Sequence, residues 1–217
     1  MIDFNELIDK HLERGKTNKK IGRYWPSEVG GCLRKTWFRY NKPKETPPDS
    51  LRHFEVGNMV HDFIAEVLRS KDNNDIELLK SELPCKLKRN NYIISGRVDD
   101  VILVKSEGKT WLIEVKSTKN LKYCEEPKES HLMQLMFYMH STGIHNGMIL
   151  YLQKDNLQAK TFKVDYDEER VQEVLNRFDE LHEYLKKNEK PEPEAKQDFE
   201  SRWKCRYCEY REECEEG

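Results

Sequence analysis

Two charged residues interrupt the apolar stretch Trp111-Leu112-Ile113-Glu114-Val115-Lys116. If this stretch is a β-strand, Glu114 and Lys116 project from the same face, because residues two apart share a face. A carboxylate can hold a hard divalent cation, and a neighbouring amine can position or deprotonate a water. The pair is equally compatible with an ordinary salt bridge, so the two residues alone do not decide between these interpretations.

A second acid comes from the preceding segment. Residues 92 to 104 and 110 to 116 are rich in Val, Ile and Leu and flank Glu107-Gly108, which predicts a β-hairpin. With a two-residue turn at Glu107-Gly108, Asp99 lies opposite Lys116. The same register sets Val101 opposite Glu114. The hairpin therefore predicts two acids and a lysine on one face.

The choice of the second acid depends on the length of the turn. Asp99 and Asp100 are adjacent, and a change of one residue in the loop would exchange one for the other on the shared face. At this point both aspartates stay open as candidates.

The elements around the hairpin are predicted from apolar periodicity. Helical spacing or composition predicts helices before and after the hairpin, and a helix that Ser130 caps. Short strands follow that helix, and prolines end the last long helix. These elements predict an α/β or α+β fold with a central mixed sheet flanked by helices. The predicted helices cover about 4–12, 27–40, 54–68, 131–140 and 171–185, and the later strands about 148–152 and 159–164.

Six cysteines form a second candidate site. Cys205, Cys208 and Cys214 have the spacing C-x2-C-x5-C, and three close thiolates require a fourth ligand. Zinc and iron-sulfur clusters are both held by four thiolates, so the spacing alone leaves both open. The remaining cysteines, which are the candidates for the fourth ligand, are Cys32, Cys85 and Cys124.

Composition limits the class of protein. The chain has 217 residues, a net charge of -2 and 36% charged residues, with no apolar run long enough for a membrane span and no signal peptide. A cytoplasmic location is expected. Because the net charge gives no overall attraction to nucleic acid, DNA contact must come from local basic patches. Aromatic residues among basic ones fit either base stacking or the core. They are Tyr24, Trp25, Trp37, Phe38 and Tyr40.

Four motifs resemble those of the PD-(D/E)xK nucleases in their RecB-like branch. They occur in the expected order, and the only departure is Val98 in place of proline before Asp99. The resemblance implies a restriction-endonuclease-like core and favours Asp99 over Asp100. The motifs are Gly57-Asn58-Met59-Val60-His61, Gly96-Arg97-Val98-Asp99, Ile113-Glu114-Val115-Lys116 and Gln134-Leu135-Met136-Phe137-Tyr138.

By this resemblance, the site binds one or two Mg²⁺ or Mn²⁺ ions. The implied metal ligands are His61, Asp99, Glu114 and the backbone carbonyl of Val115. Lys116 would orient the attacking water and stabilise charge on phosphorus. Gln134 and Tyr138, together with His131, form a polar stripe on an apolar helix. Lys116, the metal water or the DNA backbone would provide its polar partners.

A further resemblance concerns the cysteines. Residues 26 to 35, which carry Cys32, resemble the N-terminal segment of RecB-like nucleases that hold an iron-sulfur cluster with a C-terminal C-x2-C-x5-C. It implies that Cys32, Cys205, Cys208 and Cys214 hold a [4Fe-4S] cluster. The chain is then one nuclease domain over 1–217, with cluster-binding segments at about 27–40 and 200–217. Cys85 and Cys124 are expected to be ordinary small residues.

The size of the chain, with no attached helicase, is most similar to the CRISPR-associated exonucleases of the Cas-four type. That resemblance implies cleavage of single-stranded DNA, with 5′ to 3′ polarity favoured, and trimming of spacer precursors for the CRISPR integrase complex. The alternatives are a stand-alone repair or viral nuclease, a non-catalytic DNA-binding scaffold, and a zinc-ribbon adaptor.

Overall fold

The computed structural model describes residues 1–13 and 19–216, and its centre is a mixed β-sheet. The sheet runs in the order β1-β3-β4-β5-β6, and β2 pairs with β3. The pairs β1/β3 and β4/β5 are parallel and the others antiparallel, which confirms the predicted mixed sheet. The strands are β1 (Arg23–Tyr24), β2 (Ile76–Arg89), β3 (Tyr92–Val104), β4 (Lys109–Thr118), β5 (Asn146–Gln153) and β6 (Ala159–Asp165).

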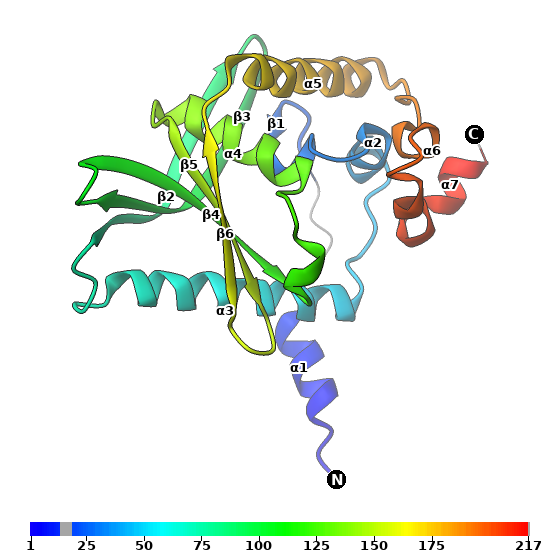
Figure 1. The fold of residues 1–217 in the computed structure, drawn as a ribbon. Helices are drawn as coiled ribbons and strands as arrows, with labels where there is room; N and C mark the ends of the chain where they lie inside the picture. The colour runs from blue at the N-terminus through cyan, green and yellow to red at the C-terminus, as the bar shows by residue number, and fades with distance from the viewer. Residues whose placement is uncertain (14–18, 217) are drawn as a thin grey trace.

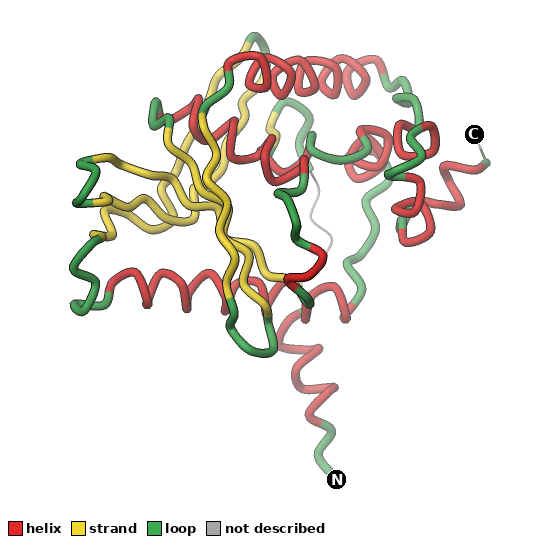
Figure 2. The backbone as a smooth tube through the Cα atoms, viewed as in Figure 1, coloured by secondary structure: helices red, strands yellow, loops and turns green. Residues whose placement is uncertain are grey.

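Helices cover both faces of the sheet (Figures 1 and 2). On one face α3 (Pro48–Arg69) buries Val60 and Ile64 against Ile113 and Val115 of β4. On the other, α4 (Glu129–Thr142) and α5 (Glu168–Lys187) pack against each other in the larger core cluster. The α/β class with helices flanking the sheet is thereby confirmed. No described helix is long and apolar enough to cross a membrane.

The smaller elements lie at the ends of the chain. The first helix, α1 (Phe4–Leu12), points away from the body of the molecule near α3, as Figure 1 shows. The C-terminal segment lies beside α2. The remaining elements are η1 (Pro26–Glu28), α2 (Leu33–Asn41), η2 (Leu121–Tyr123), α6 (Glu194–Gln197), η3 (Arg202–Tyr207) and α7 (Arg211–Glu215).

Two expectations about the elements are wrong, and one strand was not predicted. A helix over residues 27 to 40 is replaced by the single turn η1 and by α2, which begins at Leu33 after Gly30 and Gly31. Lys128, not Ser130, holds the N-cap position of α4. The long strand β2 was not predicted, because its charged residues and Pro84 conceal the alternation on a largely exposed strand.

Gly30 explains how the segment before α2 approaches α4. A Cβ atom built on Gly30 would lie 2.6 Å from the Cα atom of Ser130. That distance is shorter than any normal contact, so only glycine allows the two backbones to pack this closely. This packing fixes the stretch that leads to Cys32, the residue before α2.

Candidate active site

The hairpin of β3 and β4 brings Asp99, Glu114 and Lys116 together, but in another register than expected. The turn covers residues 105 to 108, Val104 pairs with Lys109, and Val101 lies opposite Leu112. The expected pairing of Val101 with Glu114 is therefore wrong by two positions. Because side chains alternate with a period of two, a shift of two keeps the same residues on the same face.

Asp99 lies where the pairing of β3 with β4 ends, since the last pair joins Asp100 to Ile113. Beyond that pair the amide of Val115 donates a hydrogen bond to Asp99 Oδ2 at 2.7 Å. The carboxylate thus takes the place of a strand partner, and one of its oxygens is held beside β4.

His61 approaches this carboxylate from α3. Its Nδ1 lies 3.2 Å from Asp99 Oδ1, and its side chain is 34% exposed. Burial alone would lower the pKa of His61, but the hydrogen bond and charge of Asp99 outweigh it and raise the pKa. The helix of the first motif and the hairpin therefore meet at Asp99.

Glu114 and Lys116 form a buried ion pair. Lys116 Nζ lies 2.5 Å from Glu114 Oε1, and the Glu114 side chain is only 1% exposed. Burial raises the pKa of Glu114, against the lowering effect of Lys116. Burial would lower the pKa of Lys116, but Glu114 and Asp99 raise it. These two acids therefore favour the protonated form of Lys116.

Helix α4 supplies the third side of the site. Lys116 Nζ donates to Gln134 Oε1 at 3.2 Å, and Gln134 Nε2 donates to the hydroxyl of Tyr138 at 3.2 Å. Burial, followed by the charge of Glu114, raises the pKa of Tyr138. The polar side chains of this stripe on α4 therefore have hydrogen-bond partners, and Lys116 is one of the partners expected from the sequence.

Asp100 is separated from these groups by its own hydrogen bond. Its Oδ1 accepts from the hydroxyl of Ser81 on β2 at 2.7 Å, and the residue is buried. Burial raises the pKa of Asp100. Of the two aspartates, Asp99 is the one in contact with His61 and with β4.

His131 belongs to the predicted polar stripe, and its partner Tyr151 was not singled out from the sequence. The amide of Lys128 donates to the Tyr151 hydroxyl at 3.0 Å, and this hydroxyl lies 2.7 Å from His131 Nδ1. The donor and acceptor of the contact between this hydroxyl and Nδ1 depend on the tautomer of His131. Tyr151 pairs with Lys116 across β4 and β5. The role of Tyr151 is not visible in the sequence, because it depends on contacts between β5 and α4.

His131 is expected to weaken the fold in acid. Burial, with the charges of Lys116 and Lys128, lowers the pKa of His131 to about 3. Between an unfolded pKa of about 6.5 and that value, the unfolded chain binds more protons. Stability therefore falls as pH falls through this window, by at most about 1.4 kcal/mol per pH unit. The His131→Gln variant should show a shallower decline in urea unfolding from pH 6.5 to 4 in EDTA. An unchanged slope would contradict the prediction.

The four cysteines Cys32, Cys205, Cys208 and Cys214 line a common pocket of about 380 Å³ between α2 and the C-terminal segment. Burial, then the other three thiols, raises the pKa of Cys205. Arg34 Nη1 lies 3.9 Å from Cys214 Sγ. Cys85 and Cys124 are buried elsewhere, as expected for ordinary small residues. Among the described residues, no three His, Cys, Asp or Glu side chains are already arranged to hold a metal ion.

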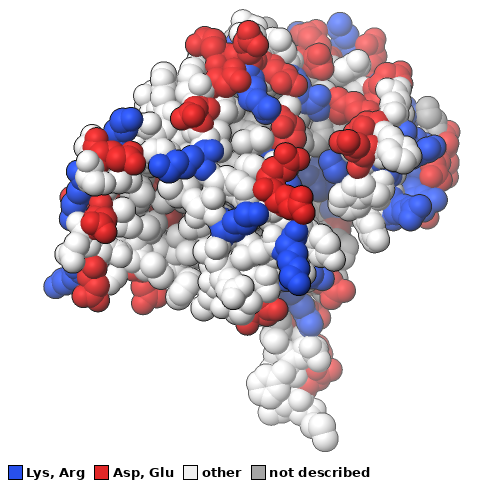
Figure 3. All heavy atoms as spheres, in the orientation of Figure 1, with Lys and Arg blue, Asp and Glu red and all other residues white. Residues whose placement is uncertain are grey.

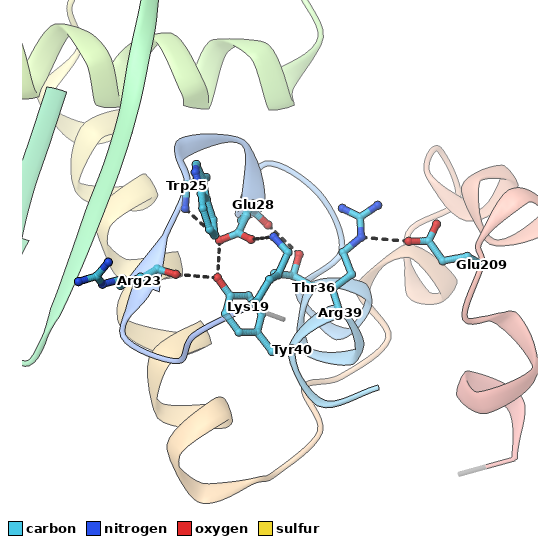
Figure 4. Close-up of polar contacts among 8 residues, drawn as sticks. All are labelled: Lys19, Arg23, Trp25, Glu28, Thr36, Arg39, Tyr40 and Glu209. Atoms are coloured by element: carbon cyan, nitrogen blue, oxygen red, sulfur yellow. Dashed lines mark hydrogen bonds and ion pairs between the residues drawn. The ribbon is translucent and has the colours of Figure 1, made fainter. Parts of the chain in front are cut away.

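Buried Glu28 anchors the strand and helix on either side of Cys32 (Figure 4). Its Oε2 accepts from the amide of Trp25 at 3.0 Å and lies 2.8 Å from the Tyr40 hydroxyl. Its Oε1 forms an ion pair with Lys19. One carboxylate therefore ties together three parts of the segment that presents Cys32.

Removal of this anchor is expected to destabilise the protein strongly. Glu28→Ala leaves the Trp25 amide and Lys19 without their buried partner, which costs about 3 kcal/mol of unfolding free energy. The matched control is Glu6→Ala, because Glu6 and Lys10 form an exposed i,i+4 pair. The control should change stability by less than about 0.5 kcal/mol. Urea unfolding followed by circular dichroism measures both, and equal effects would refute the role of Glu28.

Comparison with known families places the chain in one of them. A sequence profile described as the PD-(D/E)XK nuclease superfamily matches residues 25–215. Since the match covers most of the chain, the protein belongs to the PD-(D/E)XK nuclease superfamily. A comparison with curated proteins gives no match.

Solved structures share the fold at low sequence identity. The crystal structure of SSO0001 has 20% identity and a TM-score of 0.65, over 94% of this chain and 90% of that chain. The alkaline exonuclease LHK-Exo from Laribacter hongkongensis has 13% identity and a TM-score of 0.53, over 77% and 93%. A phage related exonuclease from Haemophilus somnus 129PT has 12% identity and a TM-score of 0.50, over 85% and 97%. At these identities the similarity concerns the fold.

Proposed function

We propose that the protein is a metal-dependent DNA nuclease that hydrolyses phosphodiester bonds at the site of His61, Asp99, Glu114 and Lys116. The observation that carries this proposal is the state of Glu114. Within the described chain, neither of its buried carboxylate oxygens accepts a hydrogen bond of good geometry, although Lys116 lies beside one of them. The charge of Lys116 lies beside only Oε1, and a divalent cation would compensate the other buried oxygen.

The donor set fits a hard divalent cation such as Mg²⁺ or Mn²⁺. Carboxylate oxygens of Asp99 and Glu114, the carbonyl of Val115 and the imidazole of His61 would hold it. When bound, the ion would polarise the phosphate and lower the pKa of a bound water. Lys116 then orients the attacking water and offsets negative charge that develops on the phosphate oxygens. Gln134 fixes the ammonium of Lys116, and Tyr138 fixes the amide of Gln134.

The cysteine pocket is the second part of the proposal. Cys32, Cys205, Cys208 and Cys214 hold a [4Fe-4S] cluster, supported by their place on one pocket and by their spacing. Such a cluster joins segments 27–40 and 200–217 across the nuclease domain at 1–217, of which residues 14–18 and 217 lie outside the described part. Zinc on the same thiolates is the alternative, and a visible absorption spectrum distinguishes the two.

The substrate is proposed to be single-stranded DNA, cut as an exonuclease with 5′ to 3′ polarity favoured. The motifs resemble those of the Cas-four type, for which the biological role would be trimming of spacer precursors with the CRISPR integrase complex. A stand-alone repair or viral nuclease has the same site chemistry. A non-catalytic scaffold is the less favoured alternative, because this chain retains both acids and the lysine in contact.

The test is cleavage of end-labelled single- and double-stranded DNA by protein purified without oxygen, with Mg²⁺, Mn²⁺ or EDTA. Metal-dependent cutting is expected, and the position of the label gives the polarity. Absence of cutting by protein with a full cluster would favour the scaffold.

A further inference from the structure

The C-terminal segment exposes aromatic and basic side chains together. Phe199, Trp203 and Tyr207 are 90%, 58% and 79% exposed. Arg202, Lys204 and Arg206 alternate with them and are also exposed. We name residues 199–207 the tail platform. Such large exposed aromatic side chains, grouped within nine residues of the chain, indicate a surface that another molecule covers.

The tail platform carries three cations and one acid, Glu200. Glu209 is paired with Lys35 and Arg39, and Glu213 is paired with Lys44. Cations of the body therefore compensate these two acids, while Asp198, just before the platform, interacts with the charge of Lys204. Within the described parts of the chain, no ion pair engages Arg202, Lys204 or Arg206. The platform therefore presents net positive charge although the chain as a whole is slightly acidic.

The rings are placed to receive flat partners. Trp203 and Tyr207 meet edge to face, with centroids 6.3 Å apart and planes at 68°. Each ring keeps more than half of its residue surface exposed. Ring faces next to cations are the combination that binds bases by stacking and phosphates by charge. In Figure 3, Lys and Arg side chains lie among acidic and uncharged ones at the right-hand edge, where the C-terminal segment lies.

The aromatic and basic segment at residues 19–40 does not offer such a surface. Tyr24, Trp37, Phe38 and Tyr40 are buried in the core, so the core alternative is confirmed for them. Several of its cations are also engaged in ion pairs. Lys19 is paired with Glu28, and Arg39 with Glu209, as drawn in Figure 4. Only Trp25 of that group is exposed, at 42%.

We propose that the tail platform is a second binding site for single-stranded DNA, in which Trp203 and Tyr207 stack on bases and the three cations contact phosphates. This inference rests on the proposed function in one respect, because the proposed nuclease activity identifies the bound polymer as DNA. Single strands are favoured over duplex because stacking requires unpaired base faces. A duplex would meet the cations but leave the rings without partners.

The platform also shares its backbone with the cysteine pocket. Trp203, Lys204 and Tyr207 line that pocket together with Cys205 and Cys208. Any variant of the platform must therefore be compared at equal cluster content, measured by iron analysis and visible absorbance. This precaution separates loss of a binding surface from loss of the cluster.

The experiment measures fluorescence anisotropy of a labelled oligothymidine in EDTA, which prevents cleavage. The Trp203→Leu/Tyr207→Leu double variant keeps apolar volume but loses the ring faces, and it should bind about tenfold more weakly or worse. The Trp203→Phe/Tyr207→Phe variant keeps ring faces and should bind within about threefold of the wild type. The matched control is Phe4→Leu, since Phe4 is an exposed aromatic residue on α1 and is 69% exposed.

The outcomes separate this inference from the nuclease proposal. If the leucine variant binds as tightly as the wild type, or if Phe4→Leu weakens binding equally, the tail platform is not the site. An equal loss of affinity for duplex DNA of the same length would also overturn it, because stacking would not be involved. If the leucine variant alone loses affinity while no protein cleaves DNA, the platform stands and the nuclease proposal fails.

Discussion

Replacing Glu114 with glutamine is expected to lower metal-dependent DNA cleavage by on the order of 10³-fold or more while the fold is retained. Glutamine keeps the shape of the buried side chain but removes the charge that would hold a divalent cation. It also leaves Lys116 without its ion pair, 2.5 Å away in the native protein. The measurement is single-turnover cleavage of end-labelled DNA with Mg²⁺ or Mn²⁺, with circular dichroism as the check of folding.

The neighbouring aspartates provide a matched pair of controls. Asp99→Asn should reduce cleavage strongly, because Asp99 contacts both His61 and the Val115 amide. Asp100→Asn should leave cleavage near the wild-type rate, because its side chain is bound to Ser81. Lys116→Ala should also reduce cleavage strongly. Undiminished cleavage by the Glu114 or Lys116 variant, or equal loss in both aspartate variants, would refute the assignment of the site.

The residues of the site could be predicted from the sequence better than the register of the hairpin that carries them. The alternation of side chains places Glu114 and Lys116 on one face whatever the turn, so their contact follows from the strand alone. The four-residue turn moved every pair by two positions, and Asp99 kept its face only because the shift was even. An odd shift would have exchanged Asp99 for Asp100, and periodicity contains no information about which occurs.

The fold was predictable where one face is apolar and unpredictable where burial is slight. Helix α5 shows regular apolar spacing and buries Val171, Leu175, Phe178 and Leu185. Strand β2 pairs with β3 and is half exposed, and the charged residues and Pro84 between Leu83, Cys85 and Leu87 conceal its apolar face. The same limit applies to the tail platform, since exposed aromatic residues and core residues look alike in sequence until their neighbours are known.

The cysteines show a third limit of prediction from the sequence. Their spacing predicted three thiols near one another, and the structure adds Cys32 to the same pocket. Sequence distance gave no reason to prefer Cys32 over Cys85 or Cys124, and that choice came from a family resemblance. Burial of Cys85 and Cys124 away from the pocket now gives a physical reason for the same choice.

Loss of one pocket cysteine is expected to remove both the visible absorbance and much of the stability. A group held by Cys32 and Cys208 closes a loop of most of the chain, and such closure contributes about 4 kcal/mol. Cys32→Ser should therefore yield colourless protein that unfolds at lower urea concentration. Both properties should be measured on protein purified without oxygen, with iron and zinc determined on the same sample.

The matched control is Cys85→Ser, which removes a buried thiol that does not line the pocket. It should keep iron and colour, although burial of a hydroxyl lowers its stability by about 1 to 3 kcal/mol. Because both variants lose stability, colour and iron content decide between them. Colourless wild-type protein with stoichiometric zinc would show that these thiolates hold zinc and not an iron-sulfur cluster. Metal-free wild-type protein as stable as the loaded form would show that ion pairs such as those of Glu209 hold the C-terminal segment without any metal.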